Sequence, residues 1–207
     1  MSRLLDNADT EANPMESDER DRADMVRLVD GHDPALNALM ERHAPKLFNY
    51  LLRSLQNEDD AADLAQETFV RVYQNRAKFD PALKFSTWLY AIASNLVRTQ
   101  FRYRTRHPQP LPLEISAQAT GSDLRESLPL DQPNPSEHLQ TSETADAVRK
   151  AIASLPEQLR TPLILFEYEE LSHAEIATIL NCTAKAVETR LYRARNQLKT
   201  VLNRLLQ

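Results

Sequence analysis

Glycine is nearly absent from this chain, with 2 residues among 207, and cysteine occurs once. So few glycines leave little room for the tight turns of a β protein, and a hydrophobic content of 42% suits packed helices. We therefore predict an all-α fold. The single cysteine excludes an internal disulfide and a cysteine-rich metal site. Residues 1–24 contain no apolar run long enough for a signal peptide or a membrane span, so the expected location is the cytoplasm, without membrane insertion.

Positive charge is outweighed by negative charge, and the formal net charge is -5. The imbalance lies in two segments. Residues 1–24 hold 8 acids and 3 bases, and residues 108–140 hold 5 acids, 1 base and 6 of the 12 prolines. We predict that 1–24 is a disordered acidic leader and that 108–140 is a flexible Pro-rich linker. Two small helical domains remain, 25–107 with 12 bases and 9 acids, and 141–207 with 9 bases and 8 acids.

The second domain contains the most informative segment, LSHAEIATILNCTAKAVETRLYRARNQLK at 171–199. Ser172 is placed to cap a first short helix, with Glu175 completing a capping box. A turn follows, and a second helix has apolar residues at steps of four, three and four, which form one stripe toward the core. These residues are Val187, Leu191, Ala194 and Leu198.

The outward side of that second helix is mostly basic. A basic helix after a tight turn predicts a helix-turn-helix that reads duplex DNA in the major groove. The candidate contact residues are Lys185, Glu188, Thr189, Arg190, Tyr192, Arg193 and Arg195. The alternative is a solvated amphipathic helix within a helical bundle.

A different surface is predicted in the first domain, in the segment KFSTWLYAIASNLVRTQFRYRTRH at 84–107. Aromatic and basic side chains alternate there without a single acid. Guanidinium groups suit phosphates and rings suit unstacked bases, so the pattern favours binding of single-stranded nucleic acid. Alternatively, Trp88 and Tyr90 are core residues and the arginines solvate a helix end.

Acids gather in EDDAADLAQETFVRVYQN at 58–75. Acids in a first helical turn favour the helix dipole. Asp59, Asp60 and Asp63 also have the DDxxD spacing of magnesium-dependent terpenoid synthases, but such enzymes need a larger helical barrel and a second metal motif. A third interpretation is a docking patch for a basic protein partner, formed by Asp63, Gln66 and Glu67 beside Phe69.

The order of these segments resembles a bacterial RNA polymerase sigma factor of the extracytoplasmic-function (ECF) group. The matching blocks are DDAADLAQETFVRVYQN, FSTWLYAIASNLVRTQFR and LPEQLRTPLILFEYEELSHAEIATILNCTAKAVETRLYRARNQL. The resemblance covers about 25–107 and 141–205, the two predicted domains.

The resemblance implies roles for named residues. The residues expected to dock on core RNA polymerase are Asp63, Gln66, Glu67 and Phe69. The candidate duplex contacts named above are expected to read the upstream promoter element. Promoter melting and single-strand binding fall to Phe85, Trp88, Tyr90, Asn95, Arg98 and Arg102, with Asn95 bordering a pocket for a flipped base. Glu188 departs from the basic residue often found at its position.

The resemblance also implies a monomer that binds core polymerase and promoter DNA and is held by an anti-sigma factor. No catalytic residue, cofactor or metal is expected, and the linker is expected to thread the polymerase interior. The main alternative is a two-domain regulator that dimerises and binds an operator by itself through the helix-turn-helix.

Overall fold

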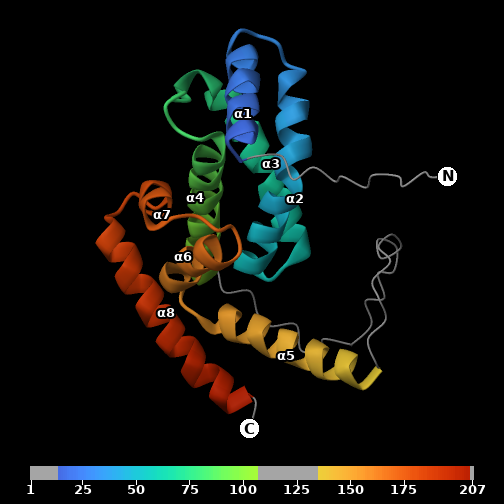
Figure 1. The fold of residues 1–207 in the computed structure, drawn as a ribbon, viewed down its shortest axis with the longest axis vertical. Helices are drawn as coiled ribbons and strands as arrows, with labels where there is room; N and C mark the ends of the chain where they lie inside the picture. Colours follow the sequence, from blue (N-terminus) through green and yellow to red (C-terminus); the bar gives the residue numbers. More distant parts are fainter. Residues whose placement is uncertain (1–13, 107–134, 206–207) are drawn as a thin grey trace, which may run out of the picture.

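The structure is a computed structural model, and it describes residues 14–106 and 135–205. Within these ranges all regular elements are helices, and this confirms the predicted all-α class. The first unit consists of α1 (Pro14–Val29), α2 (Ala35–Leu55), α3 (Glu58–Asn75), the 3-10 helix η1 (Arg76–Lys78) and α4 (Phe85–Arg106). The second unit consists of α5 (Pro135–Ser154), α6 (Glu157–Glu167), α7 (His173–Ile179) and α8 (Ala184–Leu205) (Figure 1).

The apolar sides of α2, α3 and α4 meet in the core of the first unit. A short turn between α2 and α3 makes this packing possible. Gln56 ends α2 with a left-handed backbone (φ 55°), and Asn57 begins α3 by accepting a hydrogen bond from the Asp60 amide at 2.8 Å. The acidic start of α3 then lies beside the end of α4, where the Asp60 carboxylate accepts a hydrogen bond from Gln100 at 3.1 Å.

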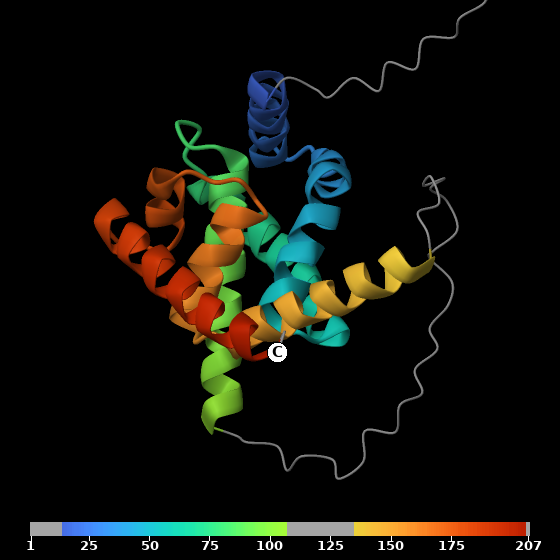
Figure 2. The same ribbon diagram turned by 60° about the horizontal axis from the view of Figure 1, so that its bottom comes forward.

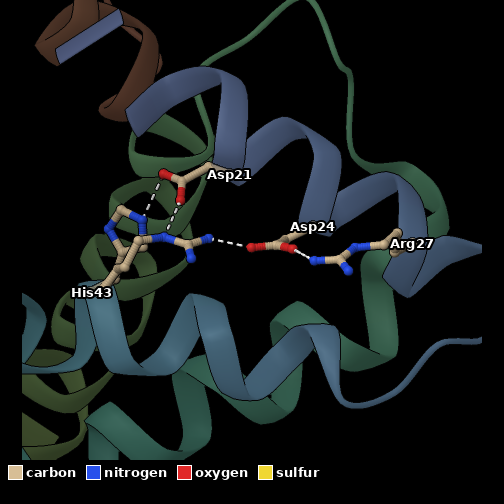
Figure 3. Close-up of polar contacts among 5 residues, drawn as sticks. Asp21, Asp24, Arg27 and His43 are labelled. Atoms are coloured by element: carbon tan, nitrogen blue, oxygen red, sulfur yellow. Dashed lines mark hydrogen bonds and ion pairs between the residues drawn. The ribbon is translucent and has the colours of Figure 1, made fainter. Parts of the chain in front are cut away.

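Residues 14–24, predicted as part of a disordered leader, instead form the first part of α1, which packs against α2 and α4. The reason is a buried polar network (Figure 3). The Asp21 side chain is buried and accepts from Arg42 Nε at 2.8 Å, and it lies 2.7 Å from His43 Nε2. Asp24 accepts from Arg42 Nη2 at 2.5 Å and also pairs with Arg27.

This network explains why acids can be buried there. Burial opposes ionisation of Asp24, but the hydrogen bonds from Arg27 and Arg42 hold the pKa of its carboxyl below its ordinary value. The partners on α2, Arg42 and His43, lie 18 to 22 residues later in the chain. An acid-rich segment that looks solvated by itself is therefore half of an ionic interface.

The second unit begins earlier than predicted, because α5 starts at Pro135, within the predicted linker. The rest of that linker, 108–134, lies outside the described residues, as do residue 107 and residues 1–13 of the leader. The predicted capping box is present: the Glu175 amide donates to Ser172 Oγ at 3.3 Å, and the Ser172 amide donates to Glu175 Oε2 at 2.9 Å. Asn181, with φ 48°, turns the chain from α7 toward α8.

The two units pack against each other. Figures 1 and 2 show α6 and α7 beside α4, with α8 on the outer side, and α6 also contacts α2. Arg160 of α6 is buried at this junction and donates to the Ser54 carbonyl of α2 at 2.8 Å. Its guanidinium also lies 5.2 Å from the centre of the Phe101 ring on α4. The sequence predicted two tethered units, and the structure adds a direct interface between them.

Candidate nucleic-acid and polymerase interfaces

The helix-turn-helix surface is formed by α7, the turn and α8. Val187, Leu191 and Ala194 are buried as the stripe predicted, and they fix which side of α8 faces outward. The Thr183 hydroxyl accepts a hydrogen bond from the Ala186 amide at 3.2 Å at the start of the helix. α8 therefore presents its basic side to solvent.

Most of the predicted duplex contacts are exposed, with Tyr192 at 68%. They are Lys185, Glu188, Thr189, Tyr192, Arg193 and Arg195. Lys185 Nζ lies 2.6 Å from Glu188 Oε2, and this hydrogen bond lowers the pKa of the Glu188 carboxyl. Arg195 pairs with Glu167 of α6 at 2.8 Å, so it also ties α8 to its own unit. Arg190 is half-buried and donates to Cys182 Sγ at 3.7 Å.

The predicted docking patch on α3 is exposed in part. Asp63 and Gln66 are exposed, one helical turn apart. Glu67 is half-buried, and its carboxylate accepts from Arg71 Nε at 2.7 Å. Together they form a polar strip on the outer side of α3 that a basic partner can approach.

Phe69 requires a correction, because its side chain is 4% exposed and packs in the core of the first unit. It shares the inward side of α3 with Ala61 and Val72. A partner cannot contact a buried ring. The exposed apolar side chain next to the polar strip is Val70, at 46%.

On α4, Asn95, Arg98 and Arg102 lie three and four residues apart and therefore on one side of the helix. Asn95 and Arg102 are exposed and Arg98 is half-buried, with its Nη1 3.5 Å from Asn95 Oδ1. This part of the predicted single-strand surface is accessible in the structure.

The aromatic part of that surface is mostly buried, which corrects the prediction for Phe85 and Tyr90. Phe85 packs edge to face on His43, with ring centres 5.0 Å apart, because it begins α4 against α2. Tyr90 is covered by the second unit. Trp88 is half-buried and packs on Phe79, with ring centres 5.3 Å apart.

Tyr90 belongs instead to a contact between the units. Its hydroxyl donates to Glu169 Oε2, in the segment after α6, at 2.5 Å. Arg53 of α2 lies 3.9 Å from the same carboxylate, and its guanidinium covers the Tyr168 ring at 4.3 Å. Burial raises the pKa of the Glu169 carboxyl, although Tyr90 and Arg53 oppose this shift.

Lys84, just before α4, makes a second contact between the units. Its Nζ lies 3.4 Å from Asp18 of α1 and 3.2 Å from Glu175 of α7. The Glu175 and Asp18 carboxylates raise the pKa of Lys84. Sequence reasoning missed Lys84, Glu169 and Arg160 as interface residues. No local pattern marks them, since each partner across the interface lies far away in the chain.

Two of the acids of α3 are engaged in the fold. Asp60 pairs with Arg104 of α4 and accepts from Gln100, and Glu67 pairs with Arg71. Within residues 14–106 and 135–205, no group of three or more His, Cys, Asp or Glu side chains is placed to hold a metal ion. In the same part of the chain, no helix is long and apolar enough to cross a bilayer.

Similarity to known proteins shows which family this chain belongs to. The sequence matches Sigma-70 region 2 over residues 39–107 and Sigma-70, region 4 over residues 145–198. It is 35% identical over 176 residues to the ECF RNA polymerase sigma factor SigW of Bacillus subtilis, covering 84% of this chain and 92% of that protein. It is 30% identical over 193 residues to the RNA polymerase sigma-H factor of Pseudomonas aeruginosa, covering 93% and 99%. The chain belongs to the ECF sigma factors.

Solved structures share the fold of this sigma factor. CnrH, in complex with the cytosolic domain of CnrY, superposes with a TM-score of 0.63 at 24% identity, covering 89% of this chain and 97% of that one. The sigma factor RpoE of Bartonella quintana, in complex with the anti-sigma factor NepR, superposes with a TM-score of 0.60 at 24% identity, covering 81% and 96%. The first unit of this sigma factor thus holds region 2 and the second unit holds region 4.

Proposed function

We propose that this ECF sigma factor binds core RNA polymerase through α3, reads the upstream promoter element as duplex through α8, and helps melt the start-proximal element through α4. The observation that carries the proposal is that each unit presents its own basic helix, α4 in region 2 and α8 in region 4. The polymerase performs the chemistry, and the sigma factor supplies promoter specificity in the cytoplasm.

We assign the polymerase-docking residues by the solvent exposure of their side chains. Asp63, Gln66 and Glu67 are the polar docking residues, with Val70 rather than Phe69 as the apolar neighbour. Docking on polymerase needs solvent-exposed groups that are not required for folding, and this strip provides them.

The two DNA surfaces use different chemistry. On α4, the Asn95 amide can donate to and accept from a base edge, while Arg98 and Arg102 contact phosphates of the single strand. On α8, Arg193 and Tyr192 are exposed, and we expect them to enter the major groove of the upstream element. The positions of the two units therefore decide which promoter spacing is read.

The packed arrangement supports an inhibited free form. The contacts of Glu169 and Lys84 hold the helix-turn-helix against α4, whereas two separate promoter elements require the units apart. The solved complexes of CnrH with CnrY and of RpoE with NepR support an anti-sigma partner. We expect an anti-sigma protein to stabilise the packed form and core polymerase to separate the units.

Run-off transcription tests the proposal, using core polymerase and genomic fragments with and without this protein. Specific transcripts that depend on the protein are the expected result. Gel shift with the protein alone tests the alternative regulator. Tight binding of a dimer to a palindrome, without any effect on transcript initiation by core polymerase, would contradict the sigma-factor role.

A further inference from the structure

A basic hollow lies between the two units, where α4 faces α6 and α8. Its volume is about 540 Å³. Four arginines line it, Arg98, Arg102 and Arg106 from α4 and Arg190 from α8. Among the described side chains that line the hollow, Glu157 is the one carboxylate. The lining residues other than Glu157 and the four arginines are neutral.

None of these four guanidinium groups has a carboxylate partner within the described residues. Arg98 Nη1 reaches the neutral Asn95 Oδ1 at 3.5 Å, and Arg190 Nη1 reaches Cys182 Sγ at 3.7 Å. The other two arginines make no hydrogen bond or ion pair within residues 14–106 and 135–205. The hollow therefore concentrates positive charge that the described protein leaves unpaired.

The same helices also carry arginines that do have carboxylate partners. Arg104, on α4, pairs with Asp60, and Arg195, on α8, pairs with Glu167. On α8, Arg193 also lacks a carboxylate partner within the described residues, but it lies outside the hollow. The hollow differs because four such guanidinium groups converge on one space.

Packing of the two units brings these like charges around one space, which costs electrostatic free energy. An anion with several phosphate groups removes that cost, because the guanidinium fork binds phosphate oxygens in pairs. A volume of 540 Å³ lies within the range of small-molecule sites and accommodates a nucleotide or a short phosphate chain.

We propose that this hollow binds a small molecule that carries two or more linked phosphate groups. Because its arginines come from both units, the bound anion bridges them and shifts the population toward the packed form. The inference rests on the proposed function in one respect: Arg98, Arg102 and Arg190 are also proposed DNA contacts, so the anion competes with promoter.

Isothermal titration of the full chain at one fixed salt concentration tests the site, with inorganic triphosphate, ATP and orthophosphate as separate probes. We expect triphosphate and ATP to bind and orthophosphate to bind at least about tenfold more weakly, because one phosphate spans fewer guanidinium groups. Tighter binding of ATP than of triphosphate identifies a nucleotide site, and equal binding identifies recognition of the phosphate chain. Absence of binding by both overturns the proposal.

Two variants on one helix provide the matched comparison. Arg190→Ala removes a guanidinium from the hollow and should weaken triphosphate binding at least about tenfold, whereas Arg193→Ala, three residues on and outside the lining, should leave it within about twofold. Equal weakening by both variants would mean nonspecific attraction to a basic surface and would overturn the site. Run-off transcription is measured separately, so that loss of the anion site is distinguished from failure of the sigma-factor role.

Discussion

Single residues on α3 separate docking from stability. Gln66→Ala and Glu67→Ala should each change the free energy of unfolding by no more than about 0.5 kcal/mol, because Gln66 is exposed and the Glu67–Arg71 pair lies on the surface. Binding to core polymerase should fall much further, as measured by co-migration of the two proteins in gel filtration. Phe69→Ala is the contrasting variant and should lower the free energy of unfolding by about 3–5 kcal/mol. Normal polymerase binding by the Gln66/Glu67 double variant would refute the docking assignment.

Two other residues separate the DNA surfaces. Arg193→Ala should weaken recognition of the duplex upstream element by about 1–3 kcal/mol if it contacts bases, while Asn95→Ala should spare that element and impair strand opening. Permanganate footprinting on duplex and pre-melted promoters distinguishes them. A pre-melted promoter should rescue Asn95→Ala alone, and rescue of Arg193→Ala alone would reverse the assignment.

Residue burial was the property that sequence reasoning predicted least well. The basic side of α8 and the capping box of Ser172 were predictable, since both depend on spacing within one helix. The burial of Phe85 and Tyr90 was not, because an aromatic ring suits both a core and a base-stacking surface. Tyr90 is buried because its hydroxyl binds Glu169, which lies 79 residues later in the chain.

At the scale of elements, α1 shows the same limit. The buried Asp21 is held by Arg42 and His43, which lie 21 and 22 residues later on α2, so composition predicted disorder for a segment that these residues hold in place. The helix-turn-helix was predictable because α8 has an apolar stripe of its own, with Val187, Leu191 and Ala194 buried. The start of α5 at Pro135 was missed because prolines dominate the preceding segment.

Breaking the α1 network should destabilise the first unit. Asp21→Ala leaves Arg42 and His43 without their buried acid and should lower the free energy of unfolding by about 1–3 kcal/mol in urea titration. Glu16→Ala, which breaks an exposed pair with Arg20 on the same helix, should cost no more than about 0.5 kcal/mol. Equal small losses would mean that α1 is held mainly by its apolar contacts.

The packing of the two units should depend on pH through Glu169, which lies between α6 and α7. Burial raises the pKa of Glu169 above its ordinary value of 4.5 when the units are packed, so the packed form binds this proton more tightly than a form in which Glu169 is exposed. The packed form therefore loses stability as the pH rises from 4.5 through the raised pKa. Small-angle X-ray scattering should show a larger radius of gyration at the higher pH.

Glu169→Gln isolates this effect, because its neutral amide retains an acceptor for Tyr90 and does not titrate in this range. It should remove most of the pH dependence, whereas Glu170→Gln, at an exposed neighbour, should leave it unchanged. An unchanged response in Glu169→Gln would assign the dependence to other groups.

At the scale of the whole molecule, charge and packing both oppose DNA binding by the free protein. The sequence carries a net charge of -5 although residues 25–107 and 141–207 are net basic, and the packed form turns Arg98 and Arg190 into one hollow. Gel shifts at one salt concentration should show weak promoter binding by the protein alone and much tighter binding with core polymerase, which fixes both contacts at once. Equally tight binding without polymerase would exclude a packed, inhibited free form.

The chain contains one tryptophan and one cysteine, and the fold places them in different units. Trp88 packs on Phe79 in the first unit, and Cys182 lies half-buried beside Arg190 in the second. An acceptor dye attached to that thiol makes Trp88 the natural donor of an energy-transfer pair. The native sequence, without any substitution, can therefore report the distance between its two halves while promoter DNA or a phosphate anion is added.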